Sequence, residues 1–170
     1  LMPPPASPAD TTVDLVISLA SGWSWVSLNV IVEGKAMTTN ALFGEHATEN
    51  DYMKDQTTFT QFYAGFGFYG TLKKVTTETM YKIKSSVAKD ITFTGKPAAL
   101  PFTKSLSGGW AYMPCPYVVS TKFPGNVFTG SFDQNDLIKS QTKFSAFYDG
   151  FGWYGLLRSF DPGQGYKLKV

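Results

Sequence analysis

The chain has 170 residues and a mass of 18.7 kDa, enough for one large domain or two small ones. Charged residues make up 16% and aromatic residues another 16%, so the sequence is too aromatic and too weakly charged for broad disorder. A net charge of +2 on scattered lysines excludes an electrostatic nucleic-acid binder. No apolar run approaches the roughly 18 residues of a membrane helix, so membrane insertion is not expected.

The first part of the chain predicts an extended arm followed by two strands. Residues 1–12 contain four prolines and few apolar side chains, which is typical of an arm outside the core. Residues 15–19 read as a strand. Residues 23–30 alternate strictly, with Ser24, Val26, Leu28 and Val30 on one face, so we expect one continuous strand there.

The chain then repeats itself. At an offset of 85, residues 43–84 match residues 128–169 with about 18 identities in 42 positions. Upstream the match continues at an offset of 87, where residues 19–23 align with residues 106–110. We therefore expect a first repeat over 13–84, a junction over 85–90 and a second repeat over 91–170.

The clearest shared motif is an aromatic hairpin. Residues 59–70 read FTQFYAGFGFYG, and residues 144–155 read FSAFYDGFGWYG. In the second copy, Asp149-Gly150 predicts a two-residue turn between strands. Short strands, glycine-rich turns and no helical periodicity predict an all-β protein. We expect two tandem sandwich- or barrel-like repeats related by pseudo-two-fold symmetry.

Catalytic constellations are missing from the sequence. His46 is the only histidine, and Cys115 is the only cysteine, with no base indicated beside it. The repeated acid, Asp51 and its counterpart Asp136, follows an asparagine in each copy and reads as a cap or turn. We therefore expect a non-enzyme with no catalytic residue, no cofactor and no metal site.

Aromatic surface is abundant instead. Aromatic residues occur at both odd and even positions of the hairpin strands, so both faces of each hairpin are apolar. Only one face can pack on the hairpin's own core, so the other needs a partner, which can be the other repeat, another subunit or a flat ligand. The residues predicted to form a self-assembly interface are Trp23, Trp25, Phe66, Phe68, Tyr69, Trp110, Tyr112, Phe151, Trp153, Tyr154, Pro3, Pro4 and Pro5.

Three sequence stretches carry a resemblance to a known family. Residues 22–30 read GWSWVSLNV, residues 63–70 read YAGFGFYG, and residues 81–84 read YKIK. This pattern resembles a β repeat of secreted and surface proteins of microbes and algae. Its duplicated form resembles the pyrenoid shell proteins of diatom chloroplasts. The likeness covers residues 13–170, but Pro114 and Pro116 stand in the second copy where the first has Ser27 and Asn29.

The resemblance implies a self-assembling sheet around the Rubisco-rich pyrenoid, in the chloroplast stroma, that supports carbon concentration and CO2 fixation. Its partners would be further copies of itself, with Rubisco or other pyrenoid proteins as additional candidates. The residues alone leave a second interpretation open: a carbohydrate-binding or adhesive module at the cell surface or outside the cell. In that case Trp23, Trp25, Trp110, Tyr112 or Trp153 would stack on sugar rings.

Overall fold

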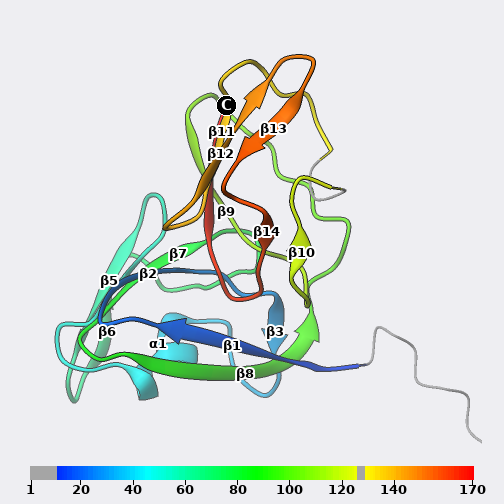
Figure 1. Ribbon diagram of the computed structural model, residues 1–170. Coiled ribbons are helices and arrows are strands. Elements are labelled where there is room, and N and C mark those ends of the chain that lie inside the picture. The colour runs from blue at the N-terminus through cyan, green and yellow to red at the C-terminus, as the bar shows by residue number, and fades with distance from the viewer. Residues whose placement is uncertain (1–10, 126–128) are drawn as a thin grey trace, which may run out of the picture.

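A computed structural model describes residues 11–125 and 129–170 (Figure 1). The expected all-β class is confirmed, since strands dominate and the described part of the chain holds one short α-helix. The strands are β1 (Val13–Leu19), β2 (Gly22–Val26), β3 (Val30–Val32), β4 (Tyr52–Lys54), β5 (Phe59–Tyr63), β6 (Gly67–Gly70), β7 (Tyr81–Ser85), β8 (Lys89–Pro97), β9 (Trp110–Met113), β10 (Thr121–Lys122), β11 (Leu137–Lys139), β12 (Phe144–Tyr148), β13 (Gly152–Gly155), β14 (Ser159–Phe160) and β15 (Tyr166–Lys169). The helix α1 (Thr39–Phe43) is followed by a 3-10 turn η2 (Gly44–His46).

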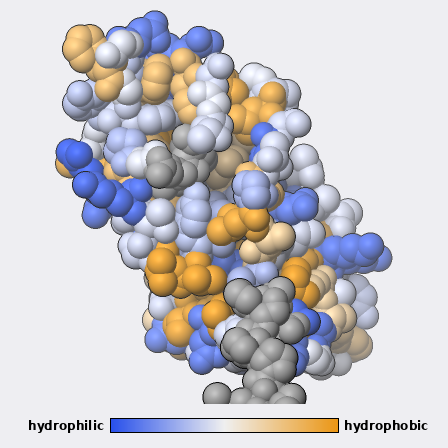
Figure 2. Space-filling view, turned by 90° about the vertical axis from the view of Figure 1, so that its right-hand side faces the viewer, coloured by the Kyte–Doolittle hydropathy of each residue, from blue (hydrophilic) through white to orange (hydrophobic). Residues whose placement is uncertain are grey.

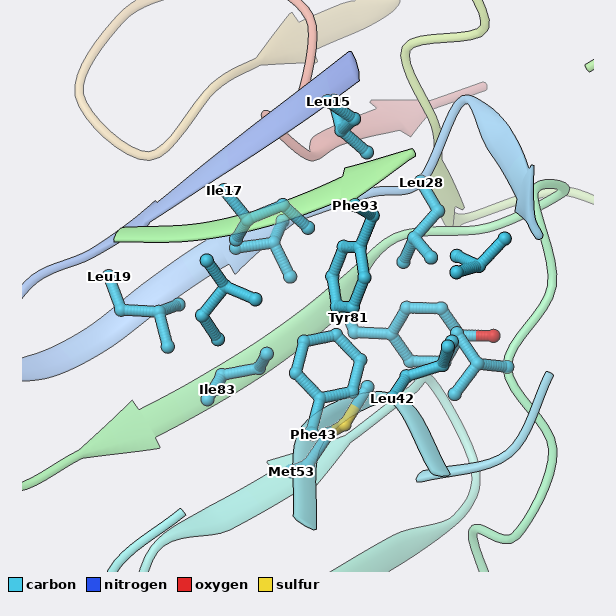
Figure 3. Close-up of a cluster of buried hydrophobic side chains, with 14 of the residues drawn as sticks. Leu15, Ile17, Leu19, Leu28, Leu42, Phe43, Met53, Tyr81, Ile83 and Phe93 are labelled. Carbon is cyan, nitrogen blue, oxygen red and sulfur yellow. The ribbon is translucent and has the colours of Figure 1, made fainter. Parts of the chain in front are cut away.

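The first core lies between two sheets. A five-stranded sheet of order β2-β7-β4-β5-β6 faces a three-stranded sheet of order β1-β8-β3. Strands β1 and β8 alternate buried and exposed residues, because each presents one face to the core and the other to solvent. Figure 3 shows Leu15, Ile17 and Phe93 pointing from β1 and β8 towards Ile83 and Met53 of the larger sheet. This sandwich is the best-filled part of the molecule.

Strand β8 departs from the repeat boundary expected from the sequence. The sequence assigned 85–90 to a junction and placed 91–97 in the second repeat. In the structure, residues 89–97 form one strand that pairs with β1 on one side and β3 on the other. Ile91 and Phe93 are buried in the first core, because they lie on the face of β8 that points towards the five-stranded sheet.

The second five-stranded sheet has the same strand order as the first. Its order is β9-β15-β11-β12-β13, and each strand lies 85 or 87 residues after the strand in the corresponding place of the first sheet. The pairing register is also the same: Phe62 lies opposite Phe68, and Phe147 lies opposite Trp153. In Figure 1 the β12–β13 hairpin stands at the top, while β5 and β6 lie at the left.

The predicted continuous strand over 23–30 is interrupted. Strand β2 ends at Val26, and the chain crosses to the smaller sheet as β3 at Val30. Ser27 and Asn29 are buried in this crossing, where they contact the second repeat. The Ser27 hydroxyl donates to the Gln164 carbonyl at 2.6 Å, and the Asn29 amide donates to the Tyr117 carbonyl at 2.8 Å. All five residues from Val26 to Val30 are therefore buried, so neither the strand ladder nor the alternation of buried and exposed residues continues through the crossing.

The aromatic hairpins close with three-residue loops rather than the expected two-residue turn. Tyr148 pairs with Gly152, so residues 149–151 form the loop, and the first copy has the same arrangement over 64–66. The Phe151 amide donates back to the Tyr148 carbonyl. The extra residue places Phe66 and Phe151 at the hairpin tips rather than inside a strand.

Candidate functional site

Each five-stranded sheet exposes an outer aromatic surface, and the two surfaces match. Trp23 and Trp110 are each 40% exposed, the tip residues Phe66 and Phe151 are 76% and 77% exposed, and Tyr69 and Tyr154 are 59% and 56% exposed. Two further counterpart pairs are exposed in the same way: Phe59 with Phe144, and Tyr63 with Tyr148. We call these ten residues the outer aromatic faces. Exposed large hydrophobic side chains gathered on one surface are typical of interaction sites.

The rings on the first outer face form an ordered platform. The Tyr52 and Phe59 rings stack at 5.5 Å and 12°, and Trp23 meets Tyr52 edge-on at 6.0 Å. Across each hairpin a tyrosine pair packs in a T shape, Tyr63 with Tyr69 at 6.3 Å and its counterpart pair at 6.2 Å. These cross-strand contacts hold the rings in fixed orientations, so the surfaces are organised before any partner arrives.

Two of the predicted interface residues belong to the interior instead. Phe68 is buried in the first core, and Trp153 packs against the second core beside Phe123 and Phe132. Both lie on the inner face of their hairpin, where the ring fills the sandwich. Pro3, Pro4 and Pro5 lie outside the described residues. Figure 2 shows a face of the molecule on which hydrophobic residues form several separate patches among polar ones.

Trp25 and Tyr112, the remaining two predicted residues, lie where the sheets of the two repeats meet. Gln141, from the second repeat, binds the edge of β2 through both ends of its amide. Its nitrogen donates to the Trp23 carbonyl at 2.7 Å, and its oxygen accepts from the Trp25 amide at 3.1 Å. The side chain thereby takes the place of a neighbouring strand along two residues of this edge.

The same contact occurs in the opposite direction. Gln56, the counterpart of Gln141, donates to the Trp110 carbonyl at 2.6 Å and accepts from the Tyr112 amide at 3.2 Å. Each repeat therefore caps an edge strand of the other with one glutamine. Gln56 and Gln141 are matched residues at the offset of 85, but a lone repeated glutamine does not indicate where its side chain points.

Lysines surround Trp25 at this contact. The Nζ atoms of Lys82, Lys139 and Lys167 lie 5.0, 5.5 and 4.9 Å from the centre of its ring. Lys54 lies directly opposite Lys82 on the neighbouring strand, as Lys139 lies opposite Lys167. We call Lys54, Lys82, Lys139 and Lys167 the lysine cluster. Each five-stranded sheet contributes one of these pairs, and all four side chains are half-buried.

The cluster is electrostatically unfavourable without a counter-charge. Lys82 and Lys167 approach the same ring, so their Nζ atoms lie at most about 10 Å apart. At an effective dielectric constant of about 20, such a pair repels by ~1.7 kcal/mol. Cation–π contacts with the neighbouring rings offset part of this repulsion, each contributing about 0.5–1 kcal/mol at an exposed site and about 2 kcal/mol when desolvated. Burial, followed by the proximity of Lys167, lowers the pKa of Lys82 from 10.5 to about 8.

A cavity of about 720 Å³ lies on the inner side of the second sheet. Residues 100–106 form one wall, with Phe102, Lys104 and Leu106 half-buried in alternation. At an offset of 87 these positions correspond to Leu15, Ile17 and Leu19 of β1, but here they form no strand. Aromatic and proline side chains complete the lining, among them Pro101, Pro114, Pro116, Tyr117, Phe132 and Phe160.

The residues considered for catalysis are not arranged for it. Cys115 is fully buried, and burial raises the pKa of its thiol to about 12, so it is protonated at neutral pH. His46 contacts the Glu45 carboxylate at 3.3 Å. The Asp51 carboxylate accepts from the Thr48 amide and Asp136 accepts from the Asp133 amide, each at 2.9 Å, so both close turns. No helical turn follows either aspartate, because each turn leads directly into a strand.

Within residues 11–125 and 129–170, no group of three or more His, Cys, Asp and Glu side chains is placed to hold a metal ion. The same described part contains no helix that is both long enough and apolar enough to cross a membrane. The two outer aromatic faces and the lysine cluster are thus its most distinctive surfaces. Comparison of the chain with family models, with curated proteins and with solved structures gave no match.

Proposed function

We propose that this chain is a non-enzymatic structural protein that assembles with copies of itself into a sheet-like shell. By its resemblance to the pyrenoid shell proteins, the shell encloses the Rubisco-rich pyrenoid at its periphery in the chloroplast stroma. There it supports carbon concentration and CO2 fixation by limiting gas leakage. Rubisco or another pyrenoid protein is a candidate partner on one of its faces.

The observation that carries this proposal is the match between the two outer aromatic faces. Five aromatic side chains on each sheet are exposed at counterpart positions and to similar extents. A chain with two similar exposed aromatic surfaces can bind two neighbouring copies at once. When such contacts do not close into a ring, they continue into a filament or a sheet.

The relation between the two sheets is part of the proposal. We interpret the shared strand order, the shared register and the reciprocal glutamine contacts as an internal pseudo-two-fold arrangement. Such an arrangement would direct the two outer aromatic faces along two related directions. It would thereby give a single chain the geometry of a dimer, and self-association would then extend the lattice from both faces.

The N-terminal arm provides a second linking element in this proposal. Residues 1–12 carry four prolines, and proline-rich segments bind grooves lined by aromatic side chains. The cavity on the second sheet has such a lining, with Phe102, Tyr117 and Phe132 beside Pro114 and Pro116. We propose that the arm of one copy binds a neighbouring copy, and this cavity offers a suitable acceptor.

Negative-stain electron microscopy of the purified chain tests the proposal directly. The chain is imaged over a range of protein and salt concentrations with no ligand added. Ordered sheets or tubes support self-assembly, whereas a monodisperse monomer at every concentration contradicts it. A fluorescent fusion expressed in a diatom then tests the location, with a signal at the pyrenoid periphery as the expected result.

The second candidate function is carbohydrate binding, favoured by the platform on the first outer face. Tyr52 and Phe59 are nearly parallel, and Trp23 stands edge-on to Tyr52, so the surface offers aromatic rings on which a sugar can stack. The amide of Gln61 lies beside it, donating to Asn50 at 3.0 Å. A monomer that binds an immobilised glycan, and loses this binding on Trp23→Ala, would favour this function over assembly.

A further inference from the structure

No acidic side chain of the described residues forms an ion pair with the lysine cluster between the two repeats. Asp55, next to Lys54, acts electrostatically on Tyr112 but is not paired with any of the four lysines. The chain carries 13 acidic residues, but the ion pairs of the described part join Glu45 to Lys35 and His46, and Asp51 to Lys89. None of them reaches the lysine cluster. Like charges directly opposite on neighbouring strands are destabilising, yet both sheets place such a pair here.

The cluster also has the architecture of a site rather than of a solvated surface. Its members come from four strands, β4 and β7 of one sheet and β11 and β15 of the other, so the fold brings them together from distant parts of the chain. Three rings lie beside Lys167: its Nζ lies 4.9 Å from the Trp25 ring, 5.3 Å from Tyr112 and 6.0 Å from Trp110. Partial burial lowers the local dielectric constant and strengthens the attraction for a charge of opposite sign.

We propose that the lysine cluster is a binding site for a small divalent oxyanion of the phosphate or sulfate class. Such an ion presents several acceptor oxygens to ammonium donors arriving from both sheets. Its two negative charges would offset the repulsion within each lysine pair. Because the donors belong to both repeats, the bound ion would also fasten the two sheets to each other, beside the contacts of Gln56 and Gln141. Trp110 belongs both to this site and to the second outer aromatic face, but the test below measures binding by the single chain and does not require assembly.

The test is thermal unfolding of the full chain with millimolar inorganic phosphate, against chloride at matched ionic strength, followed by tryptophan fluorescence. Binding to the folded state alone makes Tm rise in proportion to the logarithm of phosphate concentration. The variant Lys82→Met has two expected results. In chloride it unfolds at a higher temperature than the parent, because one repelling charge is gone. In phosphate its affinity falls about tenfold or more, because a charged donor is missing.

The matched control is Lys84→Met, on the same strand and the same face but two residues further along and exposed. It should keep the phosphate response of the parent, which excludes a general effect of salt on solubility or hydration. Should Lys82→Met fail to fold, Lys54→Met from the neighbouring strand makes the same test. Equal Tm of the parent in phosphate and chloride, or an equal loss in the Lys84 and Lys82 variants, would overturn the proposal.

Discussion

Gln56 and Gln141 make the same two hydrogen bonds in opposite directions, each to the edge strand of the other repeat. A bidentate side-chain amide is a small contact, but it satisfies a strand edge that would otherwise be open. The two glutamines are therefore the polar complement of the Trp25 and Tyr112 rings, which supply the apolar part of the same contact.

We predict that Gln56→Ala and Gln141→Ala each lower the free energy of unfolding by about 1–2 kcal/mol, because each removes two hydrogen bonds and leaves backbone groups unpaired. Urea unfolding followed by tryptophan fluorescence measures the loss. The control is Gln61→Ala, whose amide binds Asn50 within its own sheet. Losses of very different size in the two variants would argue against reciprocal roles.

The hairpin tips should matter for assembly and not for folding. Phe66 and Phe151 are about three-quarters exposed, so changing both to Ser should alter the free energy of unfolding by less than about 0.5 kcal/mol. Assembly should weaken strongly, as measured by sedimentation of the purified protein. The control is Ile31→Ser, which is also an exposed apolar change but lies on the smaller sheet. Assembly that survives the tip changes would remove the tips from the interface.

Removal of residues 1–12 should weaken assembly and leave Tm unchanged. Strand β1 begins at Val13, Thr11 and Thr12 are exposed, and residues 1–12 hold few apolar side chains in their sequence, so we expect the core to keep its packing without them. Circular dichroism during heating and electron microscopy of the same sample give both readouts. A truncated chain that unfolds would show that the arm belongs to the core.

Alanine at Gly70 or Gly155 should destabilise its own sheet by about 2–4 kcal/mol. A Cβ at Gly70 would lie 2.3 Å from the Phe59 carbonyl oxygen, and one at Gly155 would lie 2.4 Å from that of Phe144. Both glycines also have positive φ angles, which an alanine adopts only with strain. Gly108→Ala is the control, since a Cβ there would lie 4.0 Å from the Val170 carbonyl oxygen, an ordinary contact distance. Chemical denaturation measures the difference.

The effect of Lys82 on stability should depend on pH. Its pKa is about 8 in the folded chain against 10.5 ordinarily, and Lys167, Lys54 and Lys139 face it. Between these values the unfolded chain binds more protons, so this residue makes the folded state more stable as pH rises from about 8 to 10.5. The stability gained by Lys82→Met at pH 7 should therefore shrink across that window. Urea midpoints of variant and parent at each pH measure it, and a constant difference would contradict the prediction.

Periodicity and internal repetition predicted the β class and the paired hairpins, since these depend on local patterns. They did not predict where 23–30 leaves its sheet, because Ser27 and Asn29 are buried by the second repeat rather than by their own strand. Nor did they predict the place of β8. Its alternation is visible in the sequence, but its partner β1 lies more than seventy residues earlier.

The exposure of the candidate interface residues was predicted only in part, because it also depends on contacts between distant segments. Both faces of each hairpin are aromatic, so parity alone does not decide which face turns inward, and Phe68 and Trp153 were assigned to the wrong one. The four lysines of the cluster stand at matched positions of the two repeats, Lys54 with Lys139 and Lys82 with Lys167. The significance of the cluster depends on the approach of the two sheets, which no spacing within one repeat encodes.

The pairing of β1 with β8 also determines the order in which the chain can fold during synthesis. Val13 lies opposite Gly95 and Leu19 opposite Lys89, so β1 has no partner until about seventy further residues have left the ribosome. Until then Leu15 and Ile17 remain uncovered, on a strand whose edges can join another nascent chain. The first core thus closes late and through a distant contact, which makes its folding slow for its size. Chaperone protection of the nascent chain would matter most in that interval.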